Sequence, residues 1–312
     1  MIVSGISKPR LVILLGPTGV GKTAMALRMA GRWGGEIVSA DSMQVYRGMD
    51  IGTAKPTPEE RMRIPHHLLD VVAPDEPFHV SRYCDLARGV IARLHREGRP
   101  VFVVGGTGLY IRALLGGLID SPGADESLRR AMKEEIKQGG IPSLYEKLRL
   151  RDAKAAAQIS PRDAVRIIRA LEVLELTGRS IVDHQREHRF REKLYEALKI
   201  GLTLTREQLQ ARIVRRTDRM IADGFVEEVG RLLEGGYDRS LKPMQSLGYR
   251  HLAAHLAGEE DLEAAIRLIK RDTSHYAKRQ MTWFAADREI IWLAPEDYDA
   301  AAERIGHFLD GS

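Results

Sequence analysis

The residues with the clearest chemical pattern form a glycine-rich segment that ends in a lysine and a threonine. It fits G-x-x-x-x-G-K-[ST] and consists of Gly16, Pro17, Thr18, Gly19, Val20, Gly21, Lys22 and Thr23. We call these eight residues the phosphate loop, because such glycines let backbone N–H groups converge on phosphate oxygens and the lysine adds a full positive charge. The threonine hydroxyl is suited to bind Mg²⁺. The loop predicts a phosphate-rich ligand without identifying it.

The segments beside this loop have the composition of a strand and a helix. An apolar run at 11–15 precedes it and a helix-favouring run at 24–30 follows it, which is the setting in which such a loop binds phosphate. Other apolar runs predict strands at 36–40, 66–72, 101–104, 198–204 and 289–293. Helical patterns between the strands predict an α/β protein with a doubly wound parallel sheet of the P-loop NTPase type.

The pattern of strands is interrupted after about residue 120. Residues 124–190 read as helices without a strand, so we expect a helical insertion domain at 121–195 and a catalytic core at 1–120 and 196–312. In the core, helical periodicity predicts helices at 81–97, at 206–235 with a break near Gly224, and at 262–286.

The composition is that of an ordinary soluble globular protein. Hydrophobic residues make up 44% and charged residues 29% of the 312 residues, and a single cysteine excludes an internal disulfide and a cysteine-rich zinc site. No apolar run approaches the roughly 20 residues of a membrane span. The first residues are too few and too polar for a signal peptide, so we expect a cytoplasmic protein.

Arginines at helical spacing form candidate basic faces. The net charge of +5 is a weak indication of an anionic partner, but its distribution is more informative. One set comprises Arg162, Arg166 and Arg169, a second comprises Arg212, Arg215, Arg216 and Arg219, and a polar stretch between them carries Arg186, Arg189, Arg191 and Lys193. Each set is either ordinary solvated helix surface or part of a site for a large polyanion.

An aspartate at the end of the second predicted strand is the candidate for proton transfer. Phosphoryl-transfer enzymes usually place an aspartate after a buried strand to hold Mg²⁺. Here the strand at 101–104 ends in Gly105, Gly106 and Thr107 instead. Asp41 is therefore either a general base or the N-cap of the segment that follows it. For the pair His66–His67 we expect a role in a loop or core, because the sequence shows no third metal ligand.

Taken together, these segments resemble the tRNA dimethylallyltransferases, also called tRNA isopentenyltransferases. Beyond the phosphate loop, the matching runs are DSMQVYRGMDIGTAKP at 41–56, VGGTGLY at 104–110, RALEV at 169–173, QSLGYR at 245–250 and KRQMTWF at 278–284. They follow in order along nearly the whole chain, and the run at 41–56 is highly specific. The chain departs from the family where Ser160-Pro161-Arg162-Asp163 stands in place of a frequent His-Pro-Asn-Asp.

The resemblance implies a prenyl transfer. A dimethylallyl group would move from its diphosphate to the exocyclic N6 amine of the adenosine just 3′ of the anticodon, in tRNAs that read codons beginning with U. The phosphate loop would then hold a pyrophosphate group, and Mg²⁺ bound to Thr23 would help to stabilise the leaving group. Asp41 matches the family's proposed base, Arg216 its diphosphate-binding arginine and Thr107 a threonine of the site. The alternatives are a tRNA or surface contact for Arg216 and a helix N-cap for Thr107.

The resemblance also implies residues that contact the tRNA. Asp41, Ser42, Met43 and Gln44 would meet the extruded adenine, although ordinary loop packing also explains the last three. The helical insertion would clamp the anticodon stem-loop. The other implied contacts are Val165, Arg166, Ile167, Ile168, Arg169, Gln245, Gly248, Tyr249 and Arg250. We expect Mg²⁺ as the cofactor, dimethylallyl diphosphate and tRNA as the substrates, and a monomer without a membrane or an obligate protein partner.

Three other functions compete with this interpretation. A P-loop kinase for a small metabolite accounts for the phosphate loop, but not for the basic helices or the missing aspartate. An enzyme that prenylates free AMP or ADP shares the core site, but it does not need an extended basic insertion. A non-catalytic RNA-binding protein is disfavoured because Lys22, Thr23 and Asp41 are all present.

Overall fold

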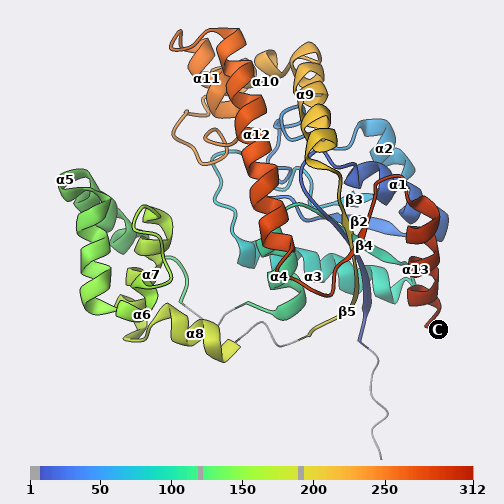
Figure 1. The fold of residues 1–312 in the computed structure, drawn as a ribbon, viewed down its shortest axis with the longest axis horizontal. Helices are drawn as coiled ribbons and strands as arrows, with labels where there is room; N and C mark the ends of the chain where they lie inside the picture. The colour runs from blue at the N-terminus through green and yellow to red at the C-terminus, as the bar shows by residue number, and fades with distance from the viewer. Residues whose placement is uncertain (1–7, 119–121, 189–192, 312) are drawn as a thin grey trace, which may run out of the picture. The chain divides into compact units, whose positions relative to one another are not determined.

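The computed structural model describes residues 8–118, 122–188 and 193–311. It divides into two compact units, one formed by Met1–Leu115 with Leu194–Ser312 and the other by Gly116–Lys193 (Figure 1). The insertion expected at 121–195 thus begins and ends a few residues earlier in the structure. We call the first the sheet unit and the second the helical unit.

The sheet unit is built on six parallel strands. Their order across the sheet is β3-β2-β4-β1-β5-β6, and every pairing is parallel. The strands are β1 (Arg10–Leu15), β2 (Glu36–Ser39), β3 (His66–His67), β4 (Val101–Gly105), β5 (Glu196–Leu202) and β6 (Ile291–Leu293). The α/β class with a parallel sheet, predicted from the alternating patterns, is confirmed.

The third strand is much shorter than predicted. We expected a strand over 66–72, but only His66 and His67 pair with β2. The backbone then turns, because Leu68 and Asp70 adopt positive φ angles of 64° and 55°, which no strand accommodates. Among the described residues, the ladder is then replaced by an isolated parallel bridge between Tyr46 and Val72.

Helices cover both faces of this sheet. α1 and α13 pack on one face and α3 on the other (Figure 1). The break predicted near Gly224 is confirmed, since this glycine, with φ 99°, separates α9 from α10. The helices of the sheet unit are α1 (Lys22–Trp33), α2 (Pro58–Arg63), α3 (Val80–Arg96), α4 (Gly108–Gly116), α9 (Arg206–Ala222), α10 (Phe225–Glu234), α11 (Tyr249–Leu256), α12 (Leu262–Phe284) and α13 (Tyr298–Asp310).

Strand β1 lies at the centre of the core. Its residues from Leu11 to Leu15 are at most 2% exposed, as expected for a strand with helices on both faces. Val12 and Leu14 point to the face where Met25 of α1 and Ile305 of α13 join the same hydrophobic cluster. The continuous apolar run that precedes the phosphate loop is therefore explained by burial on both sides.

The strand order also positions the candidate site. β2, β4 and β1 are consecutive neighbours in the sheet, and their carboxyl ends lead into Asp41, Thr107 and the phosphate loop, respectively. In parallel sheets ligands bind at this edge. Three segments that are far apart in the sequence thus meet at one edge.

The helical unit has its own core. Its helices are α5 (Glu126–Arg151), α6 (Ala153–Ala156), α7 (Ala164–Thr177) and α8 (Ile181–His188). α5 is broken at Gly140, where φ is 75° and ψ is 170°, just before Pro142. Leu144 and Leu148 of α5 pack with Ile167 and Leu171 of α7.

A buried carboxylate joins the helices of this unit. Glu172 of α7 is fully buried and accepts hydrogen bonds from Arg129 Nε at 2.8 Å, Arg169 Nη1 at 2.5 Å and the backbone N–H of Asp125 at 2.8 Å. Burial favours the neutral acid, but the bonds from Arg129 and Arg169 outweigh it and lower the pKa of Glu172. The carboxylate is therefore ionised at neutral pH.

We expect Glu172→Gln to destabilise the helical unit by about 3 kcal/mol, because it leaves two arginines without their buried partner. Glu175→Gln is the control. Glu175 lies on the same helix and pairs with Arg151 in an exposed ion pair, so its loss should cost less than about 1 kcal/mol. Hydrogen exchange of the α5 and α7 backbone amides at neutral pH measures both effects, and equal protection in the two variants would contradict the prediction.

Candidate active site

The phosphate loop runs from the end of β1 into the first turn of α1. Gly16, Gly19 and Gly21 adopt φ angles of 145°, 81° and 110°, which favour glycine. A Cβ atom at Gly16 would lie 2.7 Å from the carbonyl oxygen of Leu202, so the loop also needs glycine for its close approach to the end of β5. The backbone is thereby shaped to present N–H groups at the N-terminus of a helix.

Lys22 lies folded over this loop. Its Nζ donates hydrogen bonds to the carbonyl oxygens of Gly16 at 3.0 Å and Pro17 at 2.8 Å. Burial lowers the pKa of Lys22 to about 8, with Asp41 opposing this effect and Arg216 adding to it. A lysine with this pKa is only partly protonated above neutral pH, so a negatively charged ligand would draw a proton onto it.

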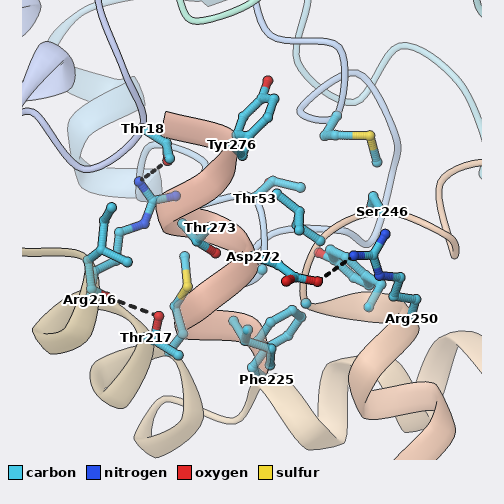
Figure 2. Close-up of a pocket in the computed structure, with 18 of the residues that line it drawn as sticks. Thr18, Thr53, Arg216, Thr217, Phe225, Ser246, Arg250, Asp272, Thr273 and Tyr276 are labelled. Atoms are coloured by element: carbon cyan, nitrogen blue, oxygen red, sulfur yellow. Dashed lines mark hydrogen bonds and ion pairs between the residues drawn. The ribbon is translucent and has the colours of Figure 1, made fainter. Parts of the chain in front are cut away.

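Two arginines of α9 meet the phosphate loop. Arg216 Nη1 donates to Thr18 Oγ1 at 3.0 Å (Figure 2), and Arg212 Nη1 donates to the carbonyl oxygen of Val20 at 2.9 Å. Burial lowers the pKa of Arg216, while Asp41 raises it. Arg215 and Arg219 of the same predicted basic face are exposed instead. The face is therefore divided between the site and the surface.

Asp41 and Thr107 are joined through Ser42. Asp41 Oδ1 accepts from the backbone N–H groups of Met43 at 2.8 Å and Gln44 at 3.3 Å, and so caps the turn that follows β2. Thr107 Oγ1 accepts from the backbone N–H of Ser42 at 3.0 Å. The carboxylate and the hydroxyl thus hold neighbouring backbone N–H groups of the same turn. The turn-capping alternative for Asp41 describes one of its oxygens, Oδ1.

A glutamine that sequence reasoning did not single out lies between these groups. Gln280 of α12 is 7% exposed; its Oε1 accepts from the backbone N–H of Thr18 at 2.9 Å and its Nε2 donates to the carbonyl oxygen of Gly106 at 2.9 Å. The available signal was its position on the helix. It lies three residues after Ala277 and four before Phe284, which are both buried, so it is a polar residue on an apolar face.

A cavity of about 470 Å³ opens beside the phosphate loop. It is enclosed by the segment after β2 and by residues of α9, α10, α11 and α12 (Figure 2). Phe225, Ile213 and Ile269 give it apolar walls. Among the predicted site residues it brings together Thr18, Asp41, Ser42, Met43, Arg216, Gln245, Gly248, Tyr249 and Arg250.

Arg250 of α11 is held at this cavity by Asp272 of α12. Its Nη2 donates to Asp272 Oδ2 at 2.6 Å (Figure 2). Burial favours the neutral acid, but hydrogen bonds from Arg271, Arg250 and His251 outweigh it and lower the pKa of Asp272 to about 2. The pair is charged throughout the physiological range. Tyr276, one turn further along α12, also lines the cavity, and burial together with Asp41 raises its pKa to about 12.

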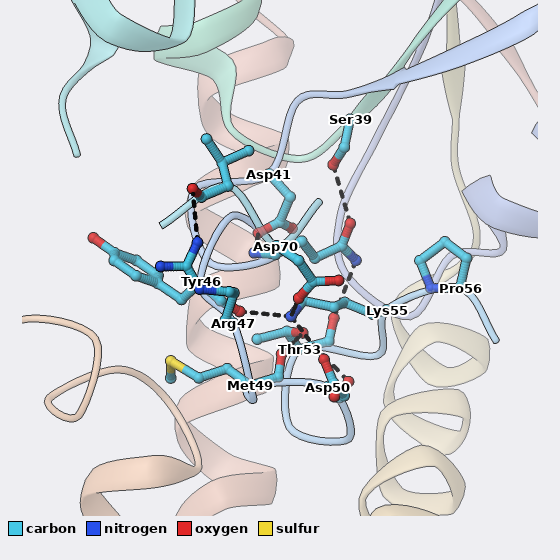
Figure 3. Close-up of polar contacts among 12 residues, drawn as sticks. Ser39, Asp41, Tyr46, Arg47, Met49, Asp50, Thr53, Lys55, Pro56 and Asp70 are labelled. Carbon is cyan, nitrogen blue, oxygen red and sulfur yellow. Dashed lines mark hydrogen bonds and ion pairs between the residues drawn. The ribbon is translucent and has the colours of Figure 1, made fainter. Parts of the chain in front are cut away.

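A buried lysine near the end of the segment 41–56 holds this segment in its conformation. Lys55 Nζ donates to the carbonyl oxygen of Tyr46 at 2.6 Å, to Asp50 Oδ1 at 2.7 Å and to Asp70 Oδ1 at 2.6 Å (Figure 3). Its side chain is 1% exposed. Burial favours neutral Asp70, but the bonds from Lys55 and Arg61 outweigh it and lower the pKa of Asp70. One buried cation thus closes the loop that begins at Asp41.

The same segment is tied to α10 and α11 by a buried carboxylate. Glu228 is 3% exposed and accepts from the backbone N–H groups of Asp50, Ile51 and Gly52 at 2.7–3.1 Å. It also accepts from the hydroxyl of Tyr249 at 2.6 Å. Every donor around this carboxylate is a backbone amide or a phenol, so its charge is compensated by hydrogen bonds rather than by a cation.

Two residues of the sheet unit that were predicted to contact tRNA have their polar side-chain groups bonded within the protein. The amide of Gln44 does not line the cavity: its Oε1 accepts from Ser39 Oγ at 3.0 Å, and its Nε2 donates to the carbonyl oxygens of Thr53 and Ala54. Loop packing, the alternative given above, describes this residue. Tyr249 borders the cavity but is only 1% exposed, with its hydroxyl used by Glu228. Neither polar group is presented to a base.

The segment 165–169 of the helical unit is also divided by burial. Ile167 and Ile168 are 0% and 8% exposed and belong to the hydrophobic core, so their side chains are not presented on the surface, and the contact of this pair with RNA stays a prediction. Val165 is 78% exposed and Arg166 is exposed, whereas Arg169 is held by Glu172. Arg162 is exposed. Arg189 and Arg191 lie outside the described residues.

Metal ligands are few in the described residues. Within 8–118, 122–188 and 193–311, no group of three or more His, Cys, Asp or Glu side chains is arranged to hold a metal ion. His66 bonds the carbonyl oxygen of Ile64, and His67 bonds Glu36. Thr23 lies half-buried in the first turn of α1. Mg²⁺ often keeps several waters and binds through substrate phosphates, so the single hydroxyl of Thr23 fits an ion shared with a diphosphate.

No helix in the described part of the chain is long and apolar enough to cross a membrane.

The chain is similar in sequence to two protein families and to named proteins along nearly its full length. The profile of a family described as IPP transferase matches residues 44–287, and that of a family described as isopentenyl transferase matches residues 9–70. A protein named tRNA dimethylallyltransferase 2 from Syntrophus aciditrophicus is 54% identical over 99% of this chain and 100% of its own. The tRNA dimethylallyltransferase of Geobacter metallireducens is 53% identical over 96% of this chain and 98% of its own.

Solved structures with names of the same kind are similar to this chain in both fold and sequence. The full-length tRNA isopentenylpyrophosphate transferase from Bacillus halodurans is 41% identical and superposes with a TM-score of 0.71, covering 97% of this chain and 96% of its own. A eukaryotic dimethylallyltransferase captured acting on tRNA superposes with a TM-score of 0.80 at 27% identity, covering 96% of this chain and 77% of its own. The family match, the identities over nearly the full length and the shared fold agree: this chain belongs to the IPP transferase family, the family of the tRNA dimethylallyltransferases.

Proposed function

We propose that this protein transfers a dimethylallyl group from dimethylallyl diphosphate to the exocyclic N6 amine of the adenosine immediately 3′ of the anticodon in tRNA, releasing diphosphate. The observation that carries the proposal is the row of strand ends β2, β4 and β1, which sets Asp41, Thr107 and the phosphate loop side by side. The names of the two sequence relatives reported above, both tRNA dimethylallyltransferases, support the same reaction.

The diphosphate belongs at the phosphate loop. Lys22, Arg216 and the loop amides lie on this side, and they would stabilise the negative charge that gathers as the allylic C–O bond breaks. Mg²⁺, which the hydroxyl of Thr23 would help to hold, adds further positive charge at the same place when bound. Arg216 already donates to Thr18 of the loop, so the guanidinium is positioned before the ligand binds.

The adenosine amine belongs at Asp41. An adenine amine is a poor nucleophile because its lone pair is delocalised into the ring, so a nearby carboxylate that accepts the proton assists the new C–N bond. Asp41 Oδ1 is used in the turn that it caps, and we assign proton acceptance to Oδ2. Thr107 fixes the neighbouring Ser42 and so orients this carboxylate.

The tRNA contacts follow the surfaces that remain available. The base must leave its stack to enter the cavity, which costs least in a loop. Ser42, Met43 and Arg250 line that cavity, and the exposed Arg162 and Arg166 of the helical unit suit phosphate contacts. That the protein works as a monomer in the cytoplasm stays a prediction from the sequence.

The transfer itself is the first test. We expect label from dimethylallyl diphosphate, supplied with Mg²⁺, to enter unmodified tRNA at the adenosine beside the anticodon and not to enter AMP or ATP. A matched tRNA with guanosine at that position should stay unlabelled. Label in free AMP would favour the nucleotide prenyltransferase, and ATP consumption without transfer would favour the kinase.

We expect Asp41→Asn to lower kcat by about 10²- to 10⁴-fold, because an amide cannot take up the amine proton. The asparagine oxygen still accepts from Met43 and Gln44, so the loop and the KM for tRNA should change little. Steady-state kinetics with tRNA varied at saturating dimethylallyl diphosphate separate the two constants. An unchanged kcat would remove Asp41 as the base.

We expect the affinity for dimethylallyl diphosphate to fall as the pH rises above about 8. The bound diphosphate raises the pKa of Lys22 above its value of about 8 in the free protein, so binding takes up a proton in this range and none well below it. The ligand is already ionised, since phosphate monoesters titrate near pH 6. Calorimetry between about pH 7 and pH 9.5 measures the slope.

Lys22→Arg is the matched control for this pH dependence. Arginine keeps the positive charge but stays protonated over the whole range, so the contribution of this side chain to the slope should vanish. If the variant retained the full slope of the natural protein, another group would be responsible for the pH dependence.

A further inference from the structure

Gln280 is a buried amide that the proposed mechanism does not use. Its two hydrogen bonds, from Thr18 N–H to Oε1 and from Nε2 to the Gly106 carbonyl oxygen, are both 2.9 Å long. A Cβ atom on Gly106 would lie 2.3 Å from Nε2, so only a glycine there leaves room for the amide. A carboxamide is an uncharged side chain with one planar end that both donates and accepts, which matches these two partners.

Both partners lead directly to groups of the reaction. Thr18 belongs to the phosphate loop, and its hydroxyl accepts from Arg216. Gly106 precedes Thr107, whose hydroxyl accepts a hydrogen bond from the backbone N–H of Ser42, the residue that follows Asp41. One side chain therefore connects the phosphate loop with the turn that supports the segment of the proposed adenosine contacts.

We propose that Gln280 is a positioning residue that sets the spacing between the bound diphosphate and the adenosine amine. The inference rests on the proposed function, in which the reacting carbon lies between these two groups. Displacing reacting atoms by about 1 Å can cost about 100-fold in rate. The amide should therefore act on kcat, while the KM for tRNA changes little.

Gln280→Glu tests this role through its pH dependence. A protonated carboxylic acid offers one O–H donor and one carbonyl acceptor, which is the pattern of the amide. The ionised form cannot donate to Gly106, and it places a negative charge beside the phosphate loop. Burial raises the pKa of such a carboxyl group, so the two forms should exchange within the pH range in which the protein can be assayed.

The measurement is kcat and KM of each variant relative to the natural protein at the same pH, from about pH 5.5 to pH 9. For Gln280→Glu at the lowest pH, we expect the kcat of the variant to lie within about fivefold of that of the natural protein. As the pH rises and the carboxyl group ionises, the ratio of variant to natural kcat should fall by at least about tenfold more. Gln280→Met fills a similar volume without either hydrogen bond and should lose about 100-fold at every pH.

Gln210→Glu is the control for the substitution itself. Gln210 is exposed on α9, so its ratio should stay near one throughout. Unfolding midpoints at each pH restrict the comparison to folded protein. Unchanged kcat in Gln280→Met, or equal losses without pH dependence in Gln280→Met and Gln280→Glu, would overturn the proposal. A natural protein that transfers nothing to tRNA would count against the proposed function instead.

Discussion

Two buried charges of opposite sign hold the segment on which the site depends. Lys55 closes the segment 41–56 onto Asp50 and Asp70, and Glu228 takes up the backbone N–H groups of Asp50, Ile51 and Gly52. A segment of this length without strand or helix would otherwise leave polar backbone groups unpaired in the interior. Glu228 also bonds Tyr249. The same carboxylate therefore fixes α11, which lines the cavity with Tyr249 and Arg250. The position of Asp41 thus follows from residues at the other end of its segment.

Charge is distributed unevenly around the resulting cavity. Lys22 and Arg216 are both partly buried beside the phosphate loop, where burial lowers the pKa of each. Such cations are costly without a counter-ion, and a bound diphosphate would supply one. The cationic Arg250 at the cavity is already paired with Asp272. At the phosphate loop the charge of Asp41 acts on both Lys22 and Arg216 without outweighing their burial, whereas Arg250 is held directly in an ion pair with Asp272. This difference supports the proposal that the diphosphate binds at the phosphate loop.

The features predictable from sequence were those fixed by local pattern. The phosphate loop, the buried strand before it and the break at Gly224 all depend on residues close together in the chain. The predicted length of the strand over 66–72 was wrong, because apolar composition does not reveal the positive φ angles at Leu68 and Asp70. Gln44 was assigned to the adenine from its residue type, yet Ser39, Thr53 and Ala54 bind its amide. The roles of Glu228 and Gln280 depend on partners more than 170 residues away in the chain, which no local pattern encodes.

The helical unit shows why a run of residues shared with a family cannot be assigned a single role. In 165–169, helical periodicity turns Ile167 and Ile168 inward and Val165 and Arg166 outward. Arg169 is intermediate, since its guanidinium bonds Glu172 and the carbonyl oxygen of Pro122. An arginine used in this way has less freedom to follow an RNA backbone, but it stiffens the helix that carries Arg166. The same five residues therefore combine a core, a support and an exposed basic side chain, Arg166, whose Nε lies 3.4 Å from Asp163 Oδ2.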